Sequence, residues 1–203
     1  LEMTCYRRSA LITGQTQGIV ADISKRCPQK RVVWIPNGVD LEAFAPLDRA
    51  VARQRLNIDQ NEFLVLFPAG RNNPEKNYQL ASEAADMLRD RGSRMMDVNS
   101  ASREEMNLLI NAADMLLVTS FHEGSPNIVK EAMACCCPVV ATAVGDIPWL
   151  FGDTPGHYLT GFDAREIAAR IGEAARFRRA RFSQNWVLAP SSYMETVSGS
   201  KAR

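Results

Sequence analysis

The sequence predicts an α/β fold built on a doubly wound parallel sheet with helices on both faces. Apolar, β-prone runs at 62–67, 115–119 and 138–142 have the continuous hydrophobicity of strands buried on both faces. Longer segments with helical spacing of apolar residues follow or precede them, at 74–91, 102–112 and 126–136. A chain that alternates strand and helix in this way builds parallel strands joined by crossover helices.

The elements are expected in the following order. Residues 10–13 predict a strand, 16–26 a helix and 31–36 a second strand, and Asn37-Gly38 is a turn signal. A short helix is expected at 49–56. The main region then alternates strands at 62–67, 94–98, 115–119, 138–142 and 157–160 with helices at 74–91, 102–112, 126–136, 147–151 and 163–176.

Composition is that of a globular protein with one sizeable core. The chain has 203 residues, 46% of them hydrophobic, and a formal net charge of +1, so nothing draws the whole molecule to nucleic acid. Five cysteines, three of them adjacent, do not form a disulfide framework and suit a reducing cytoplasm. No apolar run approaches the roughly 20 residues that span a bilayer. Because the chain begins at Leu1, we expect it to be part of a longer protein.

The segment 120–134 predicts an anion site at the start of a helix. Ser125 is a suitable N-cap and Pro126 suits the first helical position. The N–H groups of Asn127, Ile128 and Val129 would then lack partners within the helix. Such groups, together with the helix dipole, favour a phosphate.

Two carboxylates flank this helix start. Glu131 lies one turn beyond Asn127 on the same face, where it would accept hydrogen bonds from a ribose diol. Glu123 precedes the cap and could bind a sugar hydroxyl, while Gly124 keeps side-chain bulk away from a ligand. The alternative is structural: Glu123 stabilises the helix start, and Glu131 with Lys130 forms an exposed helix face.

A second loop contributes cations. Asn73 and Pro74 resemble a cap and first helical residue, which places Arg71 on the strand-to-helix loop and Lys76 in the first turn. Cations at a helix start oppose the dipole unless an anion lies between them. Arginine can grip a diphosphate through two parallel hydrogen bonds. The alternative is a pair of solvated surface charges.

Both loops follow strand ends, and ligands of open parallel sheets bind beyond those ends. We therefore expect the two loops to face one crevice that suits a nucleoside-diphosphate sugar. A dinucleotide dehydrogenase and a P-loop nucleotidase are unsupported, because neither Gly-x-Gly-x-x-Gly after the first strand nor Gly-x4-Gly-Lys-Ser/Thr is present.

Three motifs, taken together, resemble a known family. They are Glu123-x7-Glu131 with Glu-Ala-Met-Ala and Pro-Val-Val-Ala-Thr, Gly70-Arg71 with Lys76, and Ile-Pro-Asn-Gly-Val-Asp at 35–40 with Phe44 and Pro46. In this order they resemble retaining glycosyltransferases of the GT-B fold, the glycosyl transferases group 1 (family 4). The likeness runs from about residue 10 to about residue 174.

The resemblance implies a function and a set of site residues. It implies the Rossmann-like C-terminal half of a hexosyltransferase that moves a glycosyl group, with retention, from a nucleoside-diphosphate sugar to a glycan, lipid or small acceptor. Glu123 would contact the sugar, and Arg71 and Lys76 the diphosphate. No cofactor or metal is expected. The donor-binding residues implied are Gly70, Gly124, Ser125, Pro126, Asn127, Ile128 and Glu131.

The chain also departs from the family. Cys136 stands where the family often has Gly, and the segment between Leu88 and Asn111 is short, so part of the wall near the nucleotide base is expected to be missing. By resemblance, 1–34 is the remnant of an N-terminal acceptor domain with its linker, 35–182 binds the nucleotide sugar, and 183–203 is a tail. By the same resemblance, we expect the main part of the acceptor domain to be missing from this chain.

Two other functions stay open. The chain could be a non-catalytic nucleotide-sugar-binding module, or a sugar-nucleotide epimerase or phosphorylase of the same fold. The basic segment at 176–181 could make peripheral contact with a membrane, although a solvated helix end is the favoured explanation.

Overall fold

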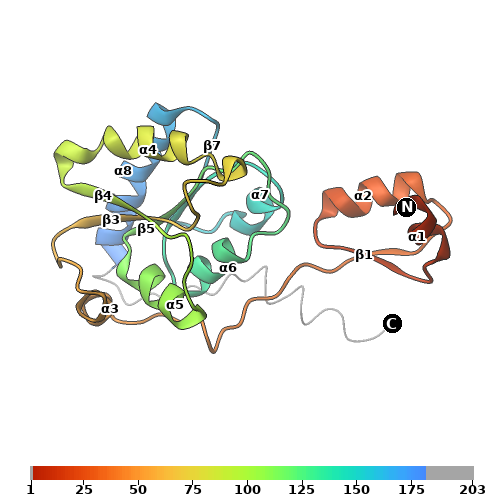
Figure 1. Ribbon diagram of the computed structural model, residues 1–203, viewed down its shortest axis with the longest axis horizontal. Coiled ribbons are helices and arrows are strands. Elements are labelled where there is room, and N and C mark those ends of the chain that lie inside the picture. The colour runs from red at the N-terminus through yellow and green to blue at the C-terminus, as the bar shows by residue number, and fades with distance from the viewer. Residues whose placement is uncertain (1, 182–203) are drawn as a thin grey trace.

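The computed structural model describes residues 2–181, and it confirms the predicted α/β class. Five parallel strands form the main sheet in the order β4-β3-β5-β6-β7 (Figure 1). The expected tail at 183–203 lies outside the described residues. The strands are β3 (Phe63–Phe67), β4 (Ser93–Asp97), β5 (Met115–Val118), β6 (Val139–Thr142) and β7 (His157–Thr160).

The hydrophobicity of the strands explains which of them lie in the centre of the sheet and which lie at its edges. The three central strands, β3, β5 and β6, are almost wholly buried, whereas the edge strands β4 and β7 are mostly half-buried. Leu116 of β5 pairs in register with Val139 of β6, and Val65 of β3 pairs with Met115. Continuous apolar runs therefore lie where helices cover both faces of the sheet.

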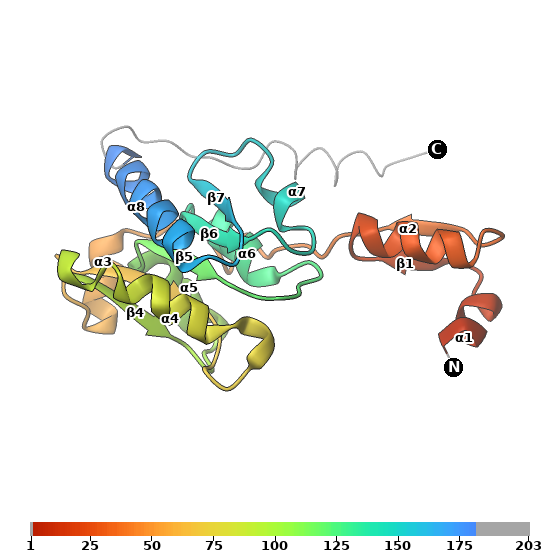
Figure 2. The same ribbon diagram turned by 90° about the horizontal axis from the view of Figure 1, so that it is seen from above.

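Alternate residues of each strand contribute to two separate cores. Leu64, Leu116 and Val139 pack on one side of the sheet with helices α3, α5, α6 and α7. Val65, Leu117 and Val140 pack on the other side with α4 and α8 (Figure 2). The helices are α3 (Arg49–Leu56), α4 (Tyr78–Asp86), α5 (Arg103–Ala112), α6 (Asn127–Ala134), α7 (Ile147–Phe151) and α8 (Ala164–Arg181).

One predicted helix is divided in the structure. Residues 74–91 form the 3₁₀ turn η1 (Pro74–Lys76), then α4, then the 3₁₀ turn η2 (Arg89–Arg91). Asn73 caps η1 as expected, but Asn77 has a φ of +51°, and this left-handed residue separates η1 from α4. Gly92, also left-handed, ends η2.

The N-terminal residues form a separate small unit. Helix α1 (Glu2–Arg8), which the sequence pattern did not predict, precedes β1 (Ile12–Gly14), α2 (Gln17–Arg26) and β2 (Val32–Trp34). Strands β1 and β2 pair in parallel as their own two-stranded sheet. A segment without regular structure then leads to α3 (Figure 1).

A buried arginine joins the elements at the amino ends of β3 and β5. Arg53 of α3 is fully buried and donates hydrogen bonds to the carbonyls of Asp59, Glu62 and Ala112. It also forms a 2.7 Å ion pair with Asp114. This clamp lies at the end of the sheet opposite to the carboxyl ends of the strands.

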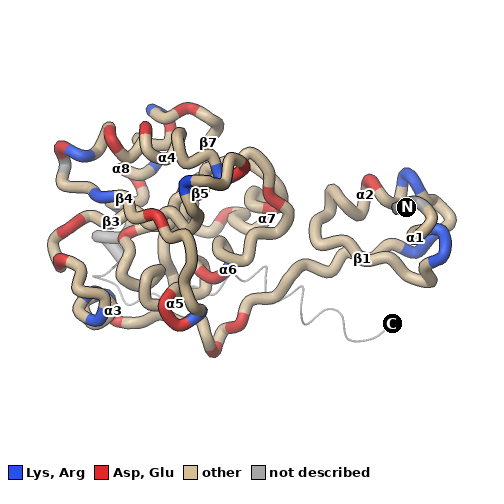
Figure 3. Tube along the Cα trace, viewed as in Figure 1, with Lys and Arg blue, Asp and Glu red and all other residues tan. Residues whose placement is uncertain are grey.

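Charged residues are spread along the described chain, with basic and acidic positions interspersed (Figure 3). Between residues 2 and 181, no helix combines the length and hydrophobicity needed to cross a bilayer.

Candidate functional site

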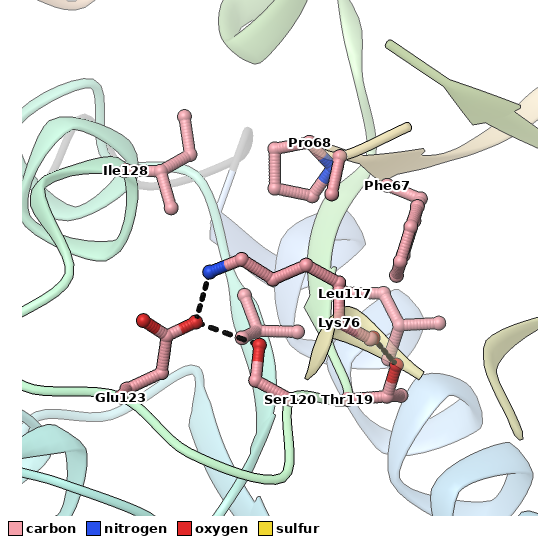
Figure 4. Close-up of a pocket in the computed structure, with 10 residues that line it drawn as sticks. Phe67, Pro68, Lys76, Leu117, Thr119, Ser120, Glu123 and Ile128 are labelled. Carbon is pink, nitrogen blue, oxygen red and sulfur yellow. Dashed lines mark hydrogen bonds and ion pairs between the residues drawn. The ribbon is translucent and has the colours of Figure 1, made fainter. Parts of the chain in front are cut away.

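The candidate site lies at the carboxyl ends of β3 and β5. From β3 the chain continues to β4 on one side, whereas β5, β6 and β7 follow on the other side, so the topology switches between β3 and β5. Open α/β sheets bind ligands at such a point. A pocket opens here, and Figure 4 shows most of its lining, which is Phe67, Pro68, Ala69, Lys76, Leu117, Val118, Thr119, Ser120, Glu123 and Ile128.

An ion pair joins the two predicted loops across this pocket. Lys76 Nζ of η1 lies 2.6 Å from Glu123 Oε1 of the loop between β5 and α6 (Figure 4). Ser120 Oγ donates to the same carboxylate oxygen at 2.6 Å. The Glu123 side chain is only 11% exposed, whereas Lys76 is 33% exposed and can reach solvent. The expectation that both loops face one crevice is therefore confirmed for Lys76 and Glu123, whereas Arg71 and Glu131 do not line this pocket.

Further hydrogen bonds fix the two loops relative to each other. Thr119 Oγ1 donates to the carbonyls of Lys76 and Asn77, and the Phe121 amide donates to the Glu75 carbonyl at 2.9 Å. The cation of one loop and the carboxylate of the other are thus held by backbone contacts as well as by their own charge.

Arg71 follows β3 but is bound to a different acid. Its guanidinium makes a bidentate contact with Asp97 at the end of β4, with both N–O distances at 2.8 Å, and lies over the Tyr78 ring. This contact raises the pKa of Arg71 and holds the pKa of Asp97 below its usual range. The sequence reasoning missed Asp97. The signal was available, since Asp97 ends the strand beside β3.

Gly70, beside Arg71, lies close to the loop that follows β4. A Cβ at this position would collide with the side chain of Asn99, which follows β4. The glycine lets the β3 and β4 loops approach each other closely at the mouth of the site.

The start of α6 differs from the prediction in one respect. Pro126, rather than Ser125, holds the N-cap position, and the helix start has no side-chain cap. The predicted cap is wrong because the Ser125 hydroxyl binds the Nζ of Lys130 instead. The N–H groups of Asn127 and Ile128 begin the helix without a capping side chain, which keeps this helix start suited to an anion.

Lys130 and Glu131 do not form the exposed helix face that was the structural alternative. Lys130 is 3% exposed, and its ammonium bonds to Ser125 and to the carbonyl of Asn37. Glu131 is half-buried, and burial raises the pKa of its carboxyl group, an effect that Arg103 of α5 opposes. Lys130 is a second residue that the sequence reasoning missed, since its partner Asn37 lies far away in the sequence.

Comparisons with known proteins show the family of the chain. The family described as glycosyl transferases group 1 matches residues 47–176. D-inositol 3-phosphate glycosyltransferase of Mycobacterium sp. (strain KMS) is 32% identical over 170 residues, which cover 70% of this chain and 38% of that protein. The chain thus spans under half of the length of this curated relative.

Two solved structures show the same fold. Sucrose-phosphate synthase from Thermosynechococcus elongatus superposes with a TM-score of 0.67 at 19% identity, covering 98% of this chain and 61% of that one. Anabaena HepE in complex with UDP and glucose gives a TM-score of 0.63 at 20% identity, covering 96% and 64%. Together with the family match and the site at the switch point, these likenesses show that the chain belongs to the group 1 glycosyltransferases.

Proposed function

We propose that this chain is the donor-binding half of a retaining glycosyltransferase. In the whole protein it would take a glycosyl group from a nucleoside-diphosphate sugar and pass it to a glycan, lipid or small acceptor. The observation that carries the proposal is the Lys76–Glu123 ion pair, which places a cation and a carboxylate next to the uncapped start of α6. A diphosphate is bound by a cation together with the N–H groups of a helix start. A carboxylate accepts hydrogen bonds from a sugar hydroxyl.

Each residue has a role in the proposed transfer. Negative charge develops on the departing diphosphate, and Lys76, Arg71 and the backbone N–H groups at the start of α6 would stabilise it. Glu123, held by Ser120, would orient the sugar through its hydroxyl groups. Glu131, one turn along α6, would accept hydrogen bonds from the ribose.

We infer that the departing diphosphate itself assists attack on the same face of the sugar, which gives retention without a general base from this part of the protein. We also expect Arg71 and Lys76, rather than a metal, to neutralise the diphosphate. Nucleotide affinity that is equal in Mg²⁺ and in EDTA would support this expectation. Affinity that is lost in EDTA would contradict it.

Calorimetry with UDP, GDP and ADP tests the proposal. UDP comes first because HepE was solved with UDP and glucose. Binding of one of the three nucleotides, with weaker binding of the corresponding nucleoside, is the expected result. A folded chain that binds none of them would refute the donor site.

We propose as a second function a nucleotide-sugar-binding module that does not catalyse transfer alone. The chain covers 38% of the curated relative, and we assign residues 1–34 to the end of an acceptor domain. Incubation with UDP-glucose discriminates the two functions. Release of UDP by the chain alone would eliminate the binding-only function.

The chain has five cysteines, of which Cys135 to Cys137 are adjacent, and Cys27, Cys135 and Cys137 are buried. We propose a reducing compartment, the cytoplasm, as its location. Fractionation of cells that produce the whole protein would test this.

A further inference from the structure

We propose that Lys130 is a positioning residue of the donor site. Together with Gly145 and Asp146, it would hold the loop Glu123–Ser125 from behind and connect that loop to the linker at Asn37. This inference rests on the proposed function, because it says how the site that binds the donor keeps its shape.

The contacts of Lys130 support this role. Its side chain is 3% exposed, although it belongs to a helix that has a solvent-facing side. Lysine is almost never buried to this degree unless its ammonium is paired. Here Nζ donates to the Asn37 carbonyl at 3.0 Å, to the Ser125 hydroxyl and, at 3.4 Å, to the Ser125 carbonyl. These acceptors match the three donors of an ammonium group.

A second segment supports the same loop. Asp146 precedes α7, and its backbone N–H donates to the Gly124 carbonyl at 3.0 Å. A Cβ on Gly145 would collide with the carbonyls of Glu123 and Gly124, and Gly145 has a φ of +60°. Only glycine allows this close approach without strain. The turn at 145–146 therefore packs directly against the backbone of the donor loop.

The charges of the two segments complement each other. Asp146 is 6% exposed, and burial raises the pKa of its carboxyl group. The Ser125 side chain and the Lys130 ammonium oppose that rise, although both carboxylate oxygens of Asp146 are buried without a hydrogen-bond partner among the described residues. The Ser125 hydroxyl thus accepts a hydrogen bond from the Lys130 ammonium, with the Asp146 carboxylate nearby.

The consequence for the site is geometric. The back of the loop binds Asp146 and Lys130, while its front presents the Glu123 carboxylate to Lys76. Because Lys130 also binds the Asn37 carbonyl, the loop is connected to the linker between β2 and α3. A site held to within a fraction of an ångström needs such support from neighbouring groups.

The test compares Lys130→Met with Arg49→Met. Methionine keeps the length and apolar character of the lysine stem but removes its hydrogen bonds. Arg49, whose side chain is 22% exposed, pairs with Asp114 at the opposite end of the sheet, so its loss removes a half-buried cation without touching the loop. Affinity for UDP, GDP or ADP, whichever binds the unmodified chain, is measured beside thermal unfolding and hydrogen exchange.

We expect Lys130→Met to bind the nucleotide about tenfold more weakly, the scale of one lost hydrogen bond to a charged group. Amide exchange over residues 122–129 should also become faster. Arg49→Met should lower the melting temperature but leave the nucleotide affinity and the amide exchange over residues 122–129 unchanged. Unaltered affinity and exchange in folded Lys130→Met would overturn the inference, as would equal losses in both variants.

Asp146→Asn gives a second test if Lys130→Met does not fold. It keeps the size of the side chain and the backbone hydrogen bond to Gly124 but removes the charge near Lys130. Weaker nucleotide binding with faster exchange at 122–129 would support the inference, and unchanged values of both would overturn it. Failure of the unmodified chain to bind any nucleotide would instead refute the proposed function.

Discussion

Each cation assigned to the diphosphate has an acidic partner in the structure. Lys76 pairs with Glu123, and Arg71 pairs with Asp97. The two pairs differ in exposure, since the side chain of Arg71 is 63% exposed and that of Lys76 only 33%. Exposed pairs are weak, so a diphosphate can compete for Arg71 at little cost. The more sheltered Lys76–Glu123 pair has the larger influence on the shape of the site.

We expect the Glu131 carboxyl group to make nucleotide binding weaker as the pH falls. Burial raises the pKa of its carboxyl group, and Arg103 opposes the rise. The proposed ribose contact needs the ionised form, so protonation as the pH falls through this raised pKa should weaken nucleotide binding. We expect the affinity advantage of the unmodified chain over Glu131→Gln to be largest at pH 8 and to shrink toward pH 5.

The ratio of the two dissociation constants is the quantity to measure, because titration of the nucleotide phosphate cancels in it. A ratio that stays constant from pH 8 to pH 5 would contradict a ribose contact through the Glu131 carboxylate.

Cys136 occupies a backbone conformation that favours glycine. Its φ is +58°, and it follows the C-cap of α6. The left-handed conformation costs an L-residue about 1–2 kcal/mol. Glycine loses about 0.5–1 kcal/mol more in chain entropy on folding. We expect Cys136→Gly to raise the free energy of unfolding by about 0.5–1 kcal/mol in urea melts. Cys136→Ala is the control, and equal stabilisation by alanine would exclude the backbone explanation.

At the scale of elements, burial decided what the sequence could predict. The strands and helix α3 were found within a residue or two, because runs such as Leu64–Leu66 are apolar on both faces of the sheet. The break at Asn77 was missed, since asparagine tolerates both helical and left-handed backbone. The predicted Ser125 cap was wrong because the Lys130 side chain, five residues further along the chain, reaches back and binds the Ser125 hydroxyl.

Some residues of the candidate site could likewise be predicted from the sequence, and others could not. The positions of Lys76 and Glu123 could be predicted, because both follow ends of neighbouring parallel strands. Asp97 could also have been assigned, since it ends the strand beside β3. Asn37 could not, because its contact with Lys130 joins segments distant in sequence.

The arginine clamp between α3 and the sheet makes a prediction about stability. Removal of one partner of a buried ion pair costs about 3–5 kcal/mol when the other charge is left without compensation. Arg49 still pairs with Asp114 here, but the variant also loses the hydrogen bonds of Arg53 to the carbonyls of Asp59, Glu62 and Ala112. Arg53→Met should therefore lower the free energy of unfolding by roughly this amount, as measured by the urea midpoint. Arg55→Met, on the exposed side of the same helix, should change it by less than about 0.5 kcal/mol. Similar losses of unfolding free energy in Arg53→Met and Arg55→Met would contradict the claim that the buried Arg53–Asp114 pair stabilises the fold.

At the scale of the whole molecule, the N-terminal unit is anchored close to the donor loop. The Trp34 ring at the end of β2 packs edge-on against Trp149 of α7, with centroids 4.7 Å apart. Three residues later, Asn37 accepts the hydrogen bond from Lys130. If residues 1–34 end an acceptor domain, as we propose, the linker that follows it contacts Lys130, which holds the donor loop. Movement between the two halves would then act on the geometry around Glu123.

The measurement that tests the account most directly is nucleotide binding to Lys76→Met. Lys25→Met is the matched control, since Lys25 is an exposed lysine in the last turn of α2. Calorimetry should show that Lys76→Met binds the preferred nucleoside diphosphate about tenfold or more weakly, because a charged hydrogen bond is worth about 1.5–3 kcal/mol. Lys25→Met should bind like the unmodified chain. Equal affinity of all three proteins would contradict the claim that the Lys76–Glu123 pair marks the diphosphate site.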